Sequence, residues 1–247
     1  GVEVWYSKAR RYVKRYQKLI QGTVNKELYL SQRGSLENLL LREVKYRQSM
    51  LTEDDVEVQV SSVSLNFRDV LNILGMYPGD PGAPGCEVSG VVMRVGKGVQ
   101  GLNVGDEVMG LGQGCLKEVV TLRQQHIHLK PSTLSMEEAS TIPIVFGTVE
   151  LALVELAKLK QGDTILIHAA AGGVGLAAIQ HAKRVRARIV ATPSEGEPEY
   201  LKPLGVDLLP TSRDSSQLLE DMIRSLCSHH LYAVLNSLHD SEQPSSL

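Results

Sequence analysis

A glycine-rich turn between an apolar segment and a helix-forming segment constrains the fold of this chain most strongly. Residues 164–168, Thr-Ile-Leu-Ile-His, have the apolar, β-branched character of a buried strand. The turn Ala-Ala-Ala-Gly-Gly-Val-Gly follows, and residues 174–185 then place Leu176, Ile179 and Ala182 on one helical face. A small-residue turn that opens a helix lets backbone N–H groups approach a phosphate. The segment therefore predicts a dinucleotide-binding loop.

Six positions of this turn fit the G-x-G-x-x-G pattern, with an alanine in the place of the first glycine. The middle glycine lets the backbone approach the pyrophosphate, and the last lets helix and strand pack closely. The predicted cofactor-binding residues of the turn are Ala170, Gly172, Gly173, Val174 and Gly175. An ordinary glycine turn is the alternative, and the strand and helix that flank the turn favour the nucleotide site.

Composition and charge exclude several classes of partner. Of the 247 residues, 43% are hydrophobic and 22% charged, as in globular proteins, and the formal net charge is -2. This balance gives no reason to expect nucleic acid or an anionic membrane as a partner. No uncharged apolar run has the length of a bilayer span, and three scattered cysteines are typical of a reducing compartment. We therefore expect a cytoplasmic protein that binds neither nucleic acid nor membrane.

The hydrophobic pattern changes near Ser135, which predicts domains of residues 1–135 and 136–247. The first contains short strand-like segments separated by glycine turns, among them an alternating segment at 56–63, and reads as a small β-rich domain. In the second, predicted strands alternate with helices, which indicates a parallel α/β sheet. Those strands are 164–168, 188–192, 207–210 and 232–236. A complete dinucleotide-binding sheet has six strands, so we expect this sheet to be incomplete toward its C-terminus.

Helix signals accompany this change of pattern. Ser135 and Glu138 have the spacing of a capping box, which predicts the start of a helix. Pro143 is expected to interrupt that helical stretch, which resumes over residues 146–158. Further helices are predicted over 197–204 and 215–227.

Five segments in order resemble the enoyl reductase domain of modular polyketide synthases. They are LNFRDVL at 65–71, GMYPG at 75–79, GDEVMGL at 105–111, HAAAGGVG at 168–175 and VLNSL at 234–238. The resemblance extends more distantly to animal fatty acid synthase, within the zinc-independent branch of the medium-chain dehydrogenase/reductase superfamily. It implies a GroES-like substrate domain followed by a Rossmann-type nucleotide-binding domain.

The resemblance also implies a reaction. Enoyl reductase domains reduce the α,β-double bond of an acyl thioester carried on an acyl carrier protein, with hydride from NADPH, beside neighbouring megasynthase domains. It implies that the tyrosine of the Gly-Met-Tyr-Pro loop, here Tyr77, donates the proton that the α-carbon receives. The alternative is that Tyr77 is an ordinary packed or exposed ring. The resemblance further assigns cofactor contacts to the positions of Asn66, Thr148, Arg213 and Asn236. Asn66 has the alternative of capping the turn that follows it.

Charge alone leaves the choice of cofactor open. NAD-preferring sites carry an acidic residue at the end of the second strand, whereas NADP sites use positive or hydroxyl side chains there. Thr192 and Ser194 suit a 2′-phosphate, but Glu195 and Glu197 repel one. We expect NADPH because of the resemblance.

The sequence departs from the family at two polar positions. The lysine associated with the family's site aligns with Glu197, and its aspartate aligns with Ser216, near Asp214. If the lysine protonates or positions the substrate, this chain is expected to be slow or inactive, with Tyr77 alone supplying the proton. Two alternatives follow: a free-standing reductase resembling quinone oxidoreductases, and a non-catalytic nucleotide-binding or scaffold remnant of a megasynthase.

A metal site is not expected. Zinc-dependent relatives use a cysteine and a His-Glu pair, and here Asn66 lies near the cysteine position while Gly85-Cys86-Glu87 replaces Gly-His-Glu. One thiol and one carboxylate do not supply the three protein ligands of a catalytic zinc. His168, at the end of the first nucleotide-domain strand, is expected to be structural.

Overall fold

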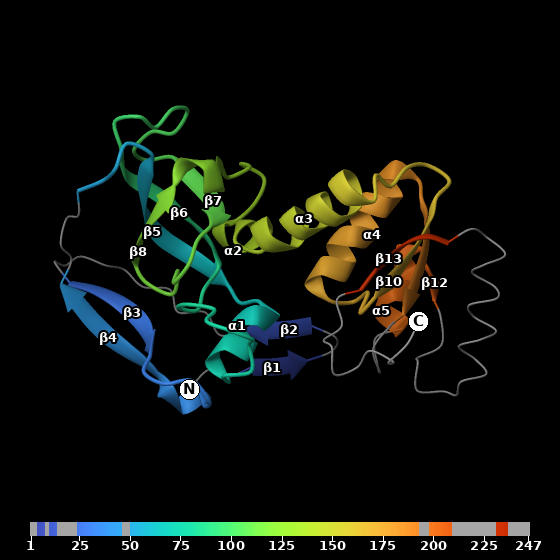
Figure 1. The fold of residues 1–247 in the computed structure, drawn as a ribbon, viewed down its shortest axis with the longest axis horizontal. Coiled ribbons are helices and arrows are strands. Elements are labelled where there is room, and N and C mark those ends of the chain that lie inside the picture. The colour runs from blue at the N-terminus through green and yellow to red at the C-terminus, as the bar shows by residue number, and fades with distance from the viewer. Residues whose placement is uncertain are drawn as a thin grey trace. The chain divides into compact units, whose positions relative to one another are not determined.

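The computed structural model describes residues 4–7, 10–13, 24–45, 50–192, 198–208 and 231–236. The chain divides into two compact units, residues 1–141 and 142–247 (Figure 1). The predicted domain boundary at Ser135 lies within the first unit, at the N-cap of the short helix α2 (Met136–Ala139).

The first unit is built around a five-stranded antiparallel sheet in the order β8-β5-β6-β7-β9. Its strands are β5 (Asp55–Ser64), β6 (Glu87–Val95), β7 (Glu107–Leu111), β8 (Val119–Arg123) and β9 (Ile127–Leu129). The buried apolar side chains of these strands form one core, which includes Val56, Val58, Val88, Val92, Val108 and Val120. The predicted β-rich domain is therefore confirmed.

Glu57 departs from the apolar–polar alternation of β5. Glu57 alternates with Val56 and Val58 along the strand, yet its side chain is only 3% exposed. Both carboxylate oxygens accept hydrogen bonds from Arg94 on β6, one from Nε and one from Nη2, each at 2.7 Å. Two parallel charge-assisted hydrogen bonds satisfy the buried carboxylate.

Two hairpins precede the sheet. In the first, β1 (Val4–Ser7) pairs with β2 (Arg10–Val13), and in the second, β3 (Val24–Leu30) pairs with β4 (Leu39–Lys45). The 3-10 turn Leu36–Asn38 leads into β4. Residues 24–30 and 39–45 thus form one antiparallel hairpin, with Gly34 and Ser35 in its connection.

The second hairpin is attached to the rest of the unit through β3. The Leu28 N–H donates to the Leu116 carbonyl at 2.7 Å. Over the described part of the chain, β4 pairs with β3 alone, so its outer edge has no neighbouring strand. Leu40 and Leu41 on β4 are 50% and 64% exposed.

Short helices complete the first unit: α1 (Phe67–Ile73), the 3-10 turn Gln124–His126, and α2. The capping box predicted at the start of α2 is confirmed. Ser135 Oγ accepts a hydrogen bond from the Glu138 N–H at 3.1 Å, and Glu138 Oε2 accepts one from the Ser135 N–H at 2.9 Å. Each side chain therefore satisfies a backbone donor that the helix leaves free.

The second unit contains a parallel sheet in the order β12-β11-β10-β13, as the strand–helix alternation predicts. Its strands are β10 (Thr164–His168), β11 (Arg188–Thr192), β12 (Asp207–Leu208) and β13 (Leu231–Leu235). Adjacent parallel strands bring their carboxyl ends to one edge, where His168 lies opposite Thr192.

Helical segments of the second unit are α3 (Pro143–Val149), the π-helix Glu150–Leu156, α4 (Gly173–Val185), α5 (Pro198–Leu201) and the 3-10 turn Lys202–Leu204. The predicted interruption of the helical stretch lies between α2, which ends at Ala139, and α3. Pro143 is the first residue of α3, where a proline is tolerated because it lacks only an N–H that has no helical partner. The helix predicted over 215–227 lies outside the described residues. No described helix has the length and apolar character of a membrane span.

The core of the second unit lies between the sheet and its helices. Ile165 and Ile167 of β10 and Ile189 of β11 are buried there with Ala178 and Ala182 of α4. Alanines on the buried face let the helix backbone approach the sheet closely. The position of β10 relative to α4 therefore determines the shape of the turn between them.

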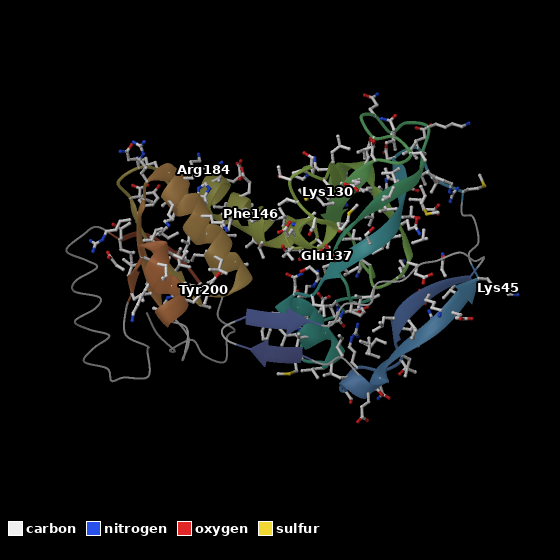
Figure 2. All side chains as sticks on the ribbon, turned by 180° about the vertical axis from the view of Figure 1, so that it is seen from behind. Lys45, Lys130, Glu137, Phe146, Arg184 and Tyr200 are labelled. Carbon is white, nitrogen blue, oxygen red and sulfur yellow. The ribbon has the colours of Figure 1, made fainter. Side chains whose placement is uncertain are left out.

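His181 is a buried polar residue of α4. It is 8% exposed, and its Nε2 has no hydrogen-bond partner among the described residues. Arg184, labelled on this helix in Figure 2, places Nη2 3.2 Å from Nδ1 of the imidazole. Burial, together with the nearby guanidinium, lowers the pKa of His181 below its ordinary value of 6.5.

We predict that His181 makes the protein less stable in acid. The folded state resists protonation, so the unfolded state binds more protons and stability falls as the pH drops below about 6.5. His181→Leu removes both the titration and the unpaired Nε2, and should flatten this loss. Thermal unfolding midpoints of both proteins at pH 8 and pH 5.5 test it; an equal fall in both would contradict the prediction.

Candidate functional site

The glycine loop of the second unit is a tight turn whose packing requires small residues. Ala169 adopts a left-handed conformation with φ of 48° directly after β10, and Gly172 caps α4 with extended backbone angles. A Cβ on Gly175 would lie 2.6 Å from both Cα and the carbonyl oxygen of Ala170. Only glycine fits at this crossing of helix and strand. The role predicted for Gly175 in close packing matches this geometry.

The N-terminus of α4 is open to an anionic ligand. Gly172 and Gly173 are exposed, and no side chain caps the helix. The first N–H groups of a helix have no partner within it and carry partial positive charge, here on a helix of 13 residues. Val145 of α3 covers one side, since a Cβ on Gly173 would lie 3.1 Å from its Cγ1. These features fit a pyrophosphate bound to the backbone.

Three sequence-predicted elements meet at the carboxyl edge of the sheet. The glycine loop leaves β10 there, Thr192 ends β11, and Asn236 follows β13, whose Leu235 pairs with Ile167. Asn236 is exposed. Dinucleotide-binding sheets bind their ligands outside the carboxyl ends of the strands. The fold therefore brings together the glycine loop, Thr192 and Asn236.

Thr192 is held by His168 on the neighbouring strand. The Nδ1 of His168 lies 3.0 Å from Oγ1 of Thr192. Burial lowers the pKa of His168, which favours the neutral imidazole near pH 7. The predicted structural role of His168 fits this contact, which fixes a hydroxyl group at the edge where an adenosine ribose binds in related folds.

The structure shows no contact between the other predicted cofactor-binding residues and the carboxyl edge of the sheet among the residues it describes. Thr148 lies on the exposed side of α3, and its Oγ1 donates to the Ile144 carbonyl at 2.8 Å. Ser194 and Arg213 lie outside the described residues, as do Glu195, Glu197, Asp214 and Ser216. Their predicted roles therefore stay predictions.

Tyr77 lies in the first unit, where the chain leaves α1. The Met76 and Tyr77 N–H groups donate to the Leu71 carbonyl at 2.8 and 3.2 Å. The Tyr77 side chain is half-buried, and the Cζ of Arg68 lies 5.3 Å from the centroid of its ring. The loop that follows, residues 78–85, contains three glycines with positive φ: Gly79, Gly82 and Gly85.

A polar stripe on α1 holds this loop in place. Asn66, Asp69 and Asn72 recur every three residues and face the chain that follows Tyr77. The Asn72 amide donates to the Gly82 carbonyl at 3.0 Å, and Asp69 Oδ1 accepts from the Gly85 N–H at 2.7 Å. The Asn66 amide donates to Glu87 Oε1 at 2.8 Å. Asn66 is the N-cap residue of α1, which is the alternative named for it, and its predicted contact with the cofactor stays a prediction.

Sequence reasoning missed Asp69, Asn72 and Glu87. Their exposed fractions are 1, 2 and 1%. The three-residue spacing of Asn66, Asp69 and Asn72 was a readable signal, because polar residues at that spacing share one helical face. No pattern in the sequence predicts that Glu87 accepts a hydrogen bond from Asn66 on that face.

Among the residues that the structure describes, no group of three or more His, Cys, Asp or Glu side chains could hold a metal ion. Cys86 donates to Asp69 Oδ1 at 3.6 Å, and burial with the neighbouring carboxylate raises the pKa of its thiol to about 11. Burial raises the pKa of Cys115 to about 12. Neutral thiols are poor zinc ligands.

Comparison with known proteins places this architecture in a family. Residues 52–132 match the alcohol dehydrogenase GroES-like domain. The chain is 39% identical over 220 residues to a highly reducing polyketide synthase of Didymella fabae, covering 88% of this chain and 12% of that protein. The chain therefore spans a small part of the curated relatives that it matches.

Solved structures agree. The CurK enoyl reductase has a TM-score of 0.78 and 34% identity, with 88% of this chain and 68% of that chain covered. The JamJ enoyl reductase, crystallised in its apo form, has a TM-score of 0.77 and 33% identity over 87% of this chain and 68% of that chain. The chain belongs to the enoyl reductase domains of polyketide synthases, within the medium-chain dehydrogenase/reductase superfamily.

Two more distant structures bear on cofactor and substrate. A quinone oxidoreductase from Coxiella burnetii has a TM-score of 0.71 and 30% identity, covering 80% of this chain and 65% of that chain. The mycobacterial protein Rv1454c, solved in complex with NADPH, has a TM-score of 0.71 and 27% identity over 83% of this chain and 63% of that chain.

We predict that Gly175→Ala weakens NADPH binding by at least about tenfold, or about 1.4 kcal/mol. The added Cβ meets the Ala170 backbone, which separates α4 from β10 and moves the N–H groups of the loop. Fluorescence titration with NADPH measures the effect, and Gln180→Ala, an exposed change on the same helix, is the control. Equal affinity in all three proteins would refute the assignment of the loop.

Proposed function

We propose that this chain is an NADPH-dependent enoyl reductase domain that reduces the α,β-double bond of an acyl thioester carried on an acyl carrier protein, in polyketide or fatty acid synthesis. The observation that carries the proposal is the glycine loop: a helix N-terminus without a capping side-chain hydrogen bond, packed against a parallel strand through Gly175. Membership of the enoyl reductase family supports the reaction.

The residues of the second unit would bind the cofactor. The backbone N–H groups of Gly173 and Val174 would donate hydrogen bonds to the pyrophosphate oxygens, and Thr192 and Asn236 would flank the ligand at the carboxyl edge of the sheet. Ser194, Arg213 and Thr148 are proposed as further contacts on the family pattern. When bound, NADPH supplies the hydride that adds to the β-carbon.

Tyr77 is proposed as the proton donor. As the β-carbon gains a hydride, the electron pair of the double bond moves toward the thioester carbonyl and leaves an enolate. The phenol O–H of Tyr77 then gives its proton to the α-carbon, and the phenolate recovers a proton from water. Half-burial of Tyr77 in a loop fixed by buried polar residues suits this role, because proton transfer requires a defined donor position.

NADPH is favoured over NADH for two reasons. Thr192 ends β11 with a neutral hydroxyl, where NAD-preferring folds carry a carboxylate that would repel a 2′-phosphate. The related Rv1454c structure contains NADPH. Glu195 and Glu197 oppose this choice by charge.

Partners follow from the relatives. The matched protein of Didymella fabae is a polyketide synthase of which this chain spans 12%. We propose that the acyl substrate arrives on an acyl carrier protein and that neighbouring megasynthase domains flank the chain.

A quinone reductase is the second candidate, supported by the 30% identity to the Coxiella burnetii enzyme. A nucleotide-binding remnant without turnover is the third, favoured by Glu197 and Ser216 at the positions of the family's lysine and aspartate. The three candidates differ in what they do with NADPH.

We predict oxidation of NADPH by the protein with crotonyl thioester, followed as loss of absorbance at fixed times, and no oxidation with a benzoquinone. Turnover with the quinone alone would establish the second candidate. Measurable NADPH binding without turnover of either substrate would sink the enzyme assignment and leave a binding protein.

We predict that Tyr77→Phe lowers kcat by at least about tenfold while the KM for NADPH changes little, since a general acid contributes about 10²–10⁴ in rate. Tyr29→Phe, at a 39% exposed tyrosine of the same unit, is the control and should behave as wild type. With a 2-methylcrotonyl thioester, Tyr77→Phe should also change the configuration at the α-carbon. Wild-type rate and chirality would remove Tyr77 from the mechanism.

A further inference from the structure

Arg68, in the first turn of α1, contacts both the Tyr77 ring and the loop that follows it. Its Cζ lies 5.3 Å from the centroid of the ring. Its Nη2 donates to the Pro81 carbonyl at 3.4 Å, and its Nη1 lies 3.7 Å from Sγ of Cys86. Among the described residues, none of the ion pairs includes Arg68.

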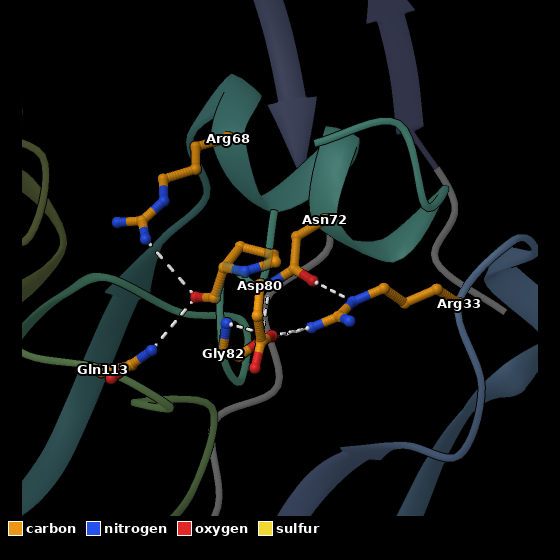
Figure 3. Close-up of polar contacts among 7 residues, drawn as sticks. Arg33, Arg68, Asn72, Asp80, Gly82 and Gln113 are labelled. Carbon is orange, nitrogen blue, oxygen red and sulfur yellow. Dashed lines mark hydrogen bonds and ion pairs between the residues drawn. The ribbon is translucent and has the colours of Figure 1, made fainter. Parts of the chain in front are cut away.

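The backbone of this loop is also held from other sides, as Figure 3 shows. Gln113 Nε2 donates to the same Pro81 carbonyl at 3.1 Å. Arg33 Nη2 donates to Asp80 Oδ1 at 2.7 Å and to the Gly82 carbonyl at 3.3 Å. Two arginines thus hold one loop, and Arg68 adds a contact with the aromatic ring.

The contact between Arg68 and Tyr77 restricts how the ring can turn. A guanidinium within about 6 Å of a tyrosine face is attracted by the negative charge above the ring. The bond to the Pro81 carbonyl fixes the guanidinium, so the attraction favours one ring orientation. Because a proton donor displaced by about 1 Å can lose about a hundredfold in rate, orientation of the phenol matters for transfer.

We infer that Arg68 is a positioning residue that holds the Tyr77 ring in the orientation from which its phenol protonates one face of the α-carbon. The inference rests on the proposed function, in which Tyr77 donates that proton. Arg33→Met is the matched control, because Arg33 holds the same loop through Asp80 and Gly82.

Kinetics with a 2-methylcrotonyl thioester test the inference. Arg68→Met should lower kcat about tenfold, with KM within about twofold, and should give mixed configuration at the α-carbon. Arg68→Lys keeps a cation over the ring and should recover most of the rate and the wild-type configuration. Arg33→Met should keep that configuration. Mixed configuration in Arg33→Met, equal to that in Arg68→Met, would assign the effect to loop structure and overturn the inference.

A double-mutant cycle separates positioning from a general loss of structure. In the Tyr77→Phe background there is no phenol to position, so Arg68→Met should lower kcat no further. An equal loss of kcat in both backgrounds would show that Arg68 acts independently of Tyr77 and would overturn the inference.

A measurement without turnover keeps the inference separate from the proposed function. With tyrosine ring-¹³C labelling, the Tyr77 signal is identified by its absence in Tyr77→Phe. It should move in Arg68→Met and stay in place in Arg33→Met. An unmoved signal in Arg68→Met overturns the inference even if the wild type is active. If the wild type oxidises no NADPH, the proposed function is refuted. A Tyr77 signal that moves in Arg68→Met would still show that Arg68 orients the ring.

Discussion

The buried carboxylate of Asp69 is the interaction on which the first unit's candidate site depends. It accepts hydrogen bonds from the Asn66 N–H at 2.9 Å and from the Gly85 N–H at 2.7 Å, and so joins the start of α1 to the end of the Tyr77 loop. Each bond satisfies a backbone donor that would otherwise be left without a partner, and the charge strengthens both bonds in a site shielded from water. The loop is therefore part of the folded core of the unit rather than an independent surface segment.

The two units hold their candidate functional groups in place in different ways. In the first, charged and amide side chains reach from α1 to backbone groups and fix the loop that carries Tyr77. In the second, three glycines provide the site: Gly175 lets helix and strand touch, and Gly172 and Gly173 are exposed at the N-terminus of α4. A reactive side chain needs a rigid support, whereas a phosphate site needs exposed backbone.

The features that could be predicted from the sequence depend on regular spacing or on near neighbours, whereas contacts between distant residues could not be predicted. Periodicity gave the strands and α4, since burial of apolar side chains follows a regular spacing, and the Ser135–Glu138 cap is a contact between near neighbours. The contacts of Asp69 and Asn72 were not predicted, because their partners at Gly85 and Gly82 are brought close only by a loop of glycines and prolines. The burial of Glu57 was not predicted for a related reason: its carboxylate is paired with Arg94, a residue on another strand. The role of Tyr77 as proton donor was suggested by the family resemblance, because no charge pattern in the sequence indicates it.

The free edge of β4 has a consequence for the protein in concentrated solution. Among the described residues, the outer edge of β4 has no neighbouring strand, so it presents backbone donors and acceptors, beside the exposed Leu40 and Leu41, to which a strand from another molecule can add. The next residues, Arg42 and Glu43, are exposed, as is Lys45 at the end of the strand. In a parallel, in-register stack each of these charges would lie beside its own copy, so the strand itself opposes that route to aggregation while leaving the leucines available to a different partner surface.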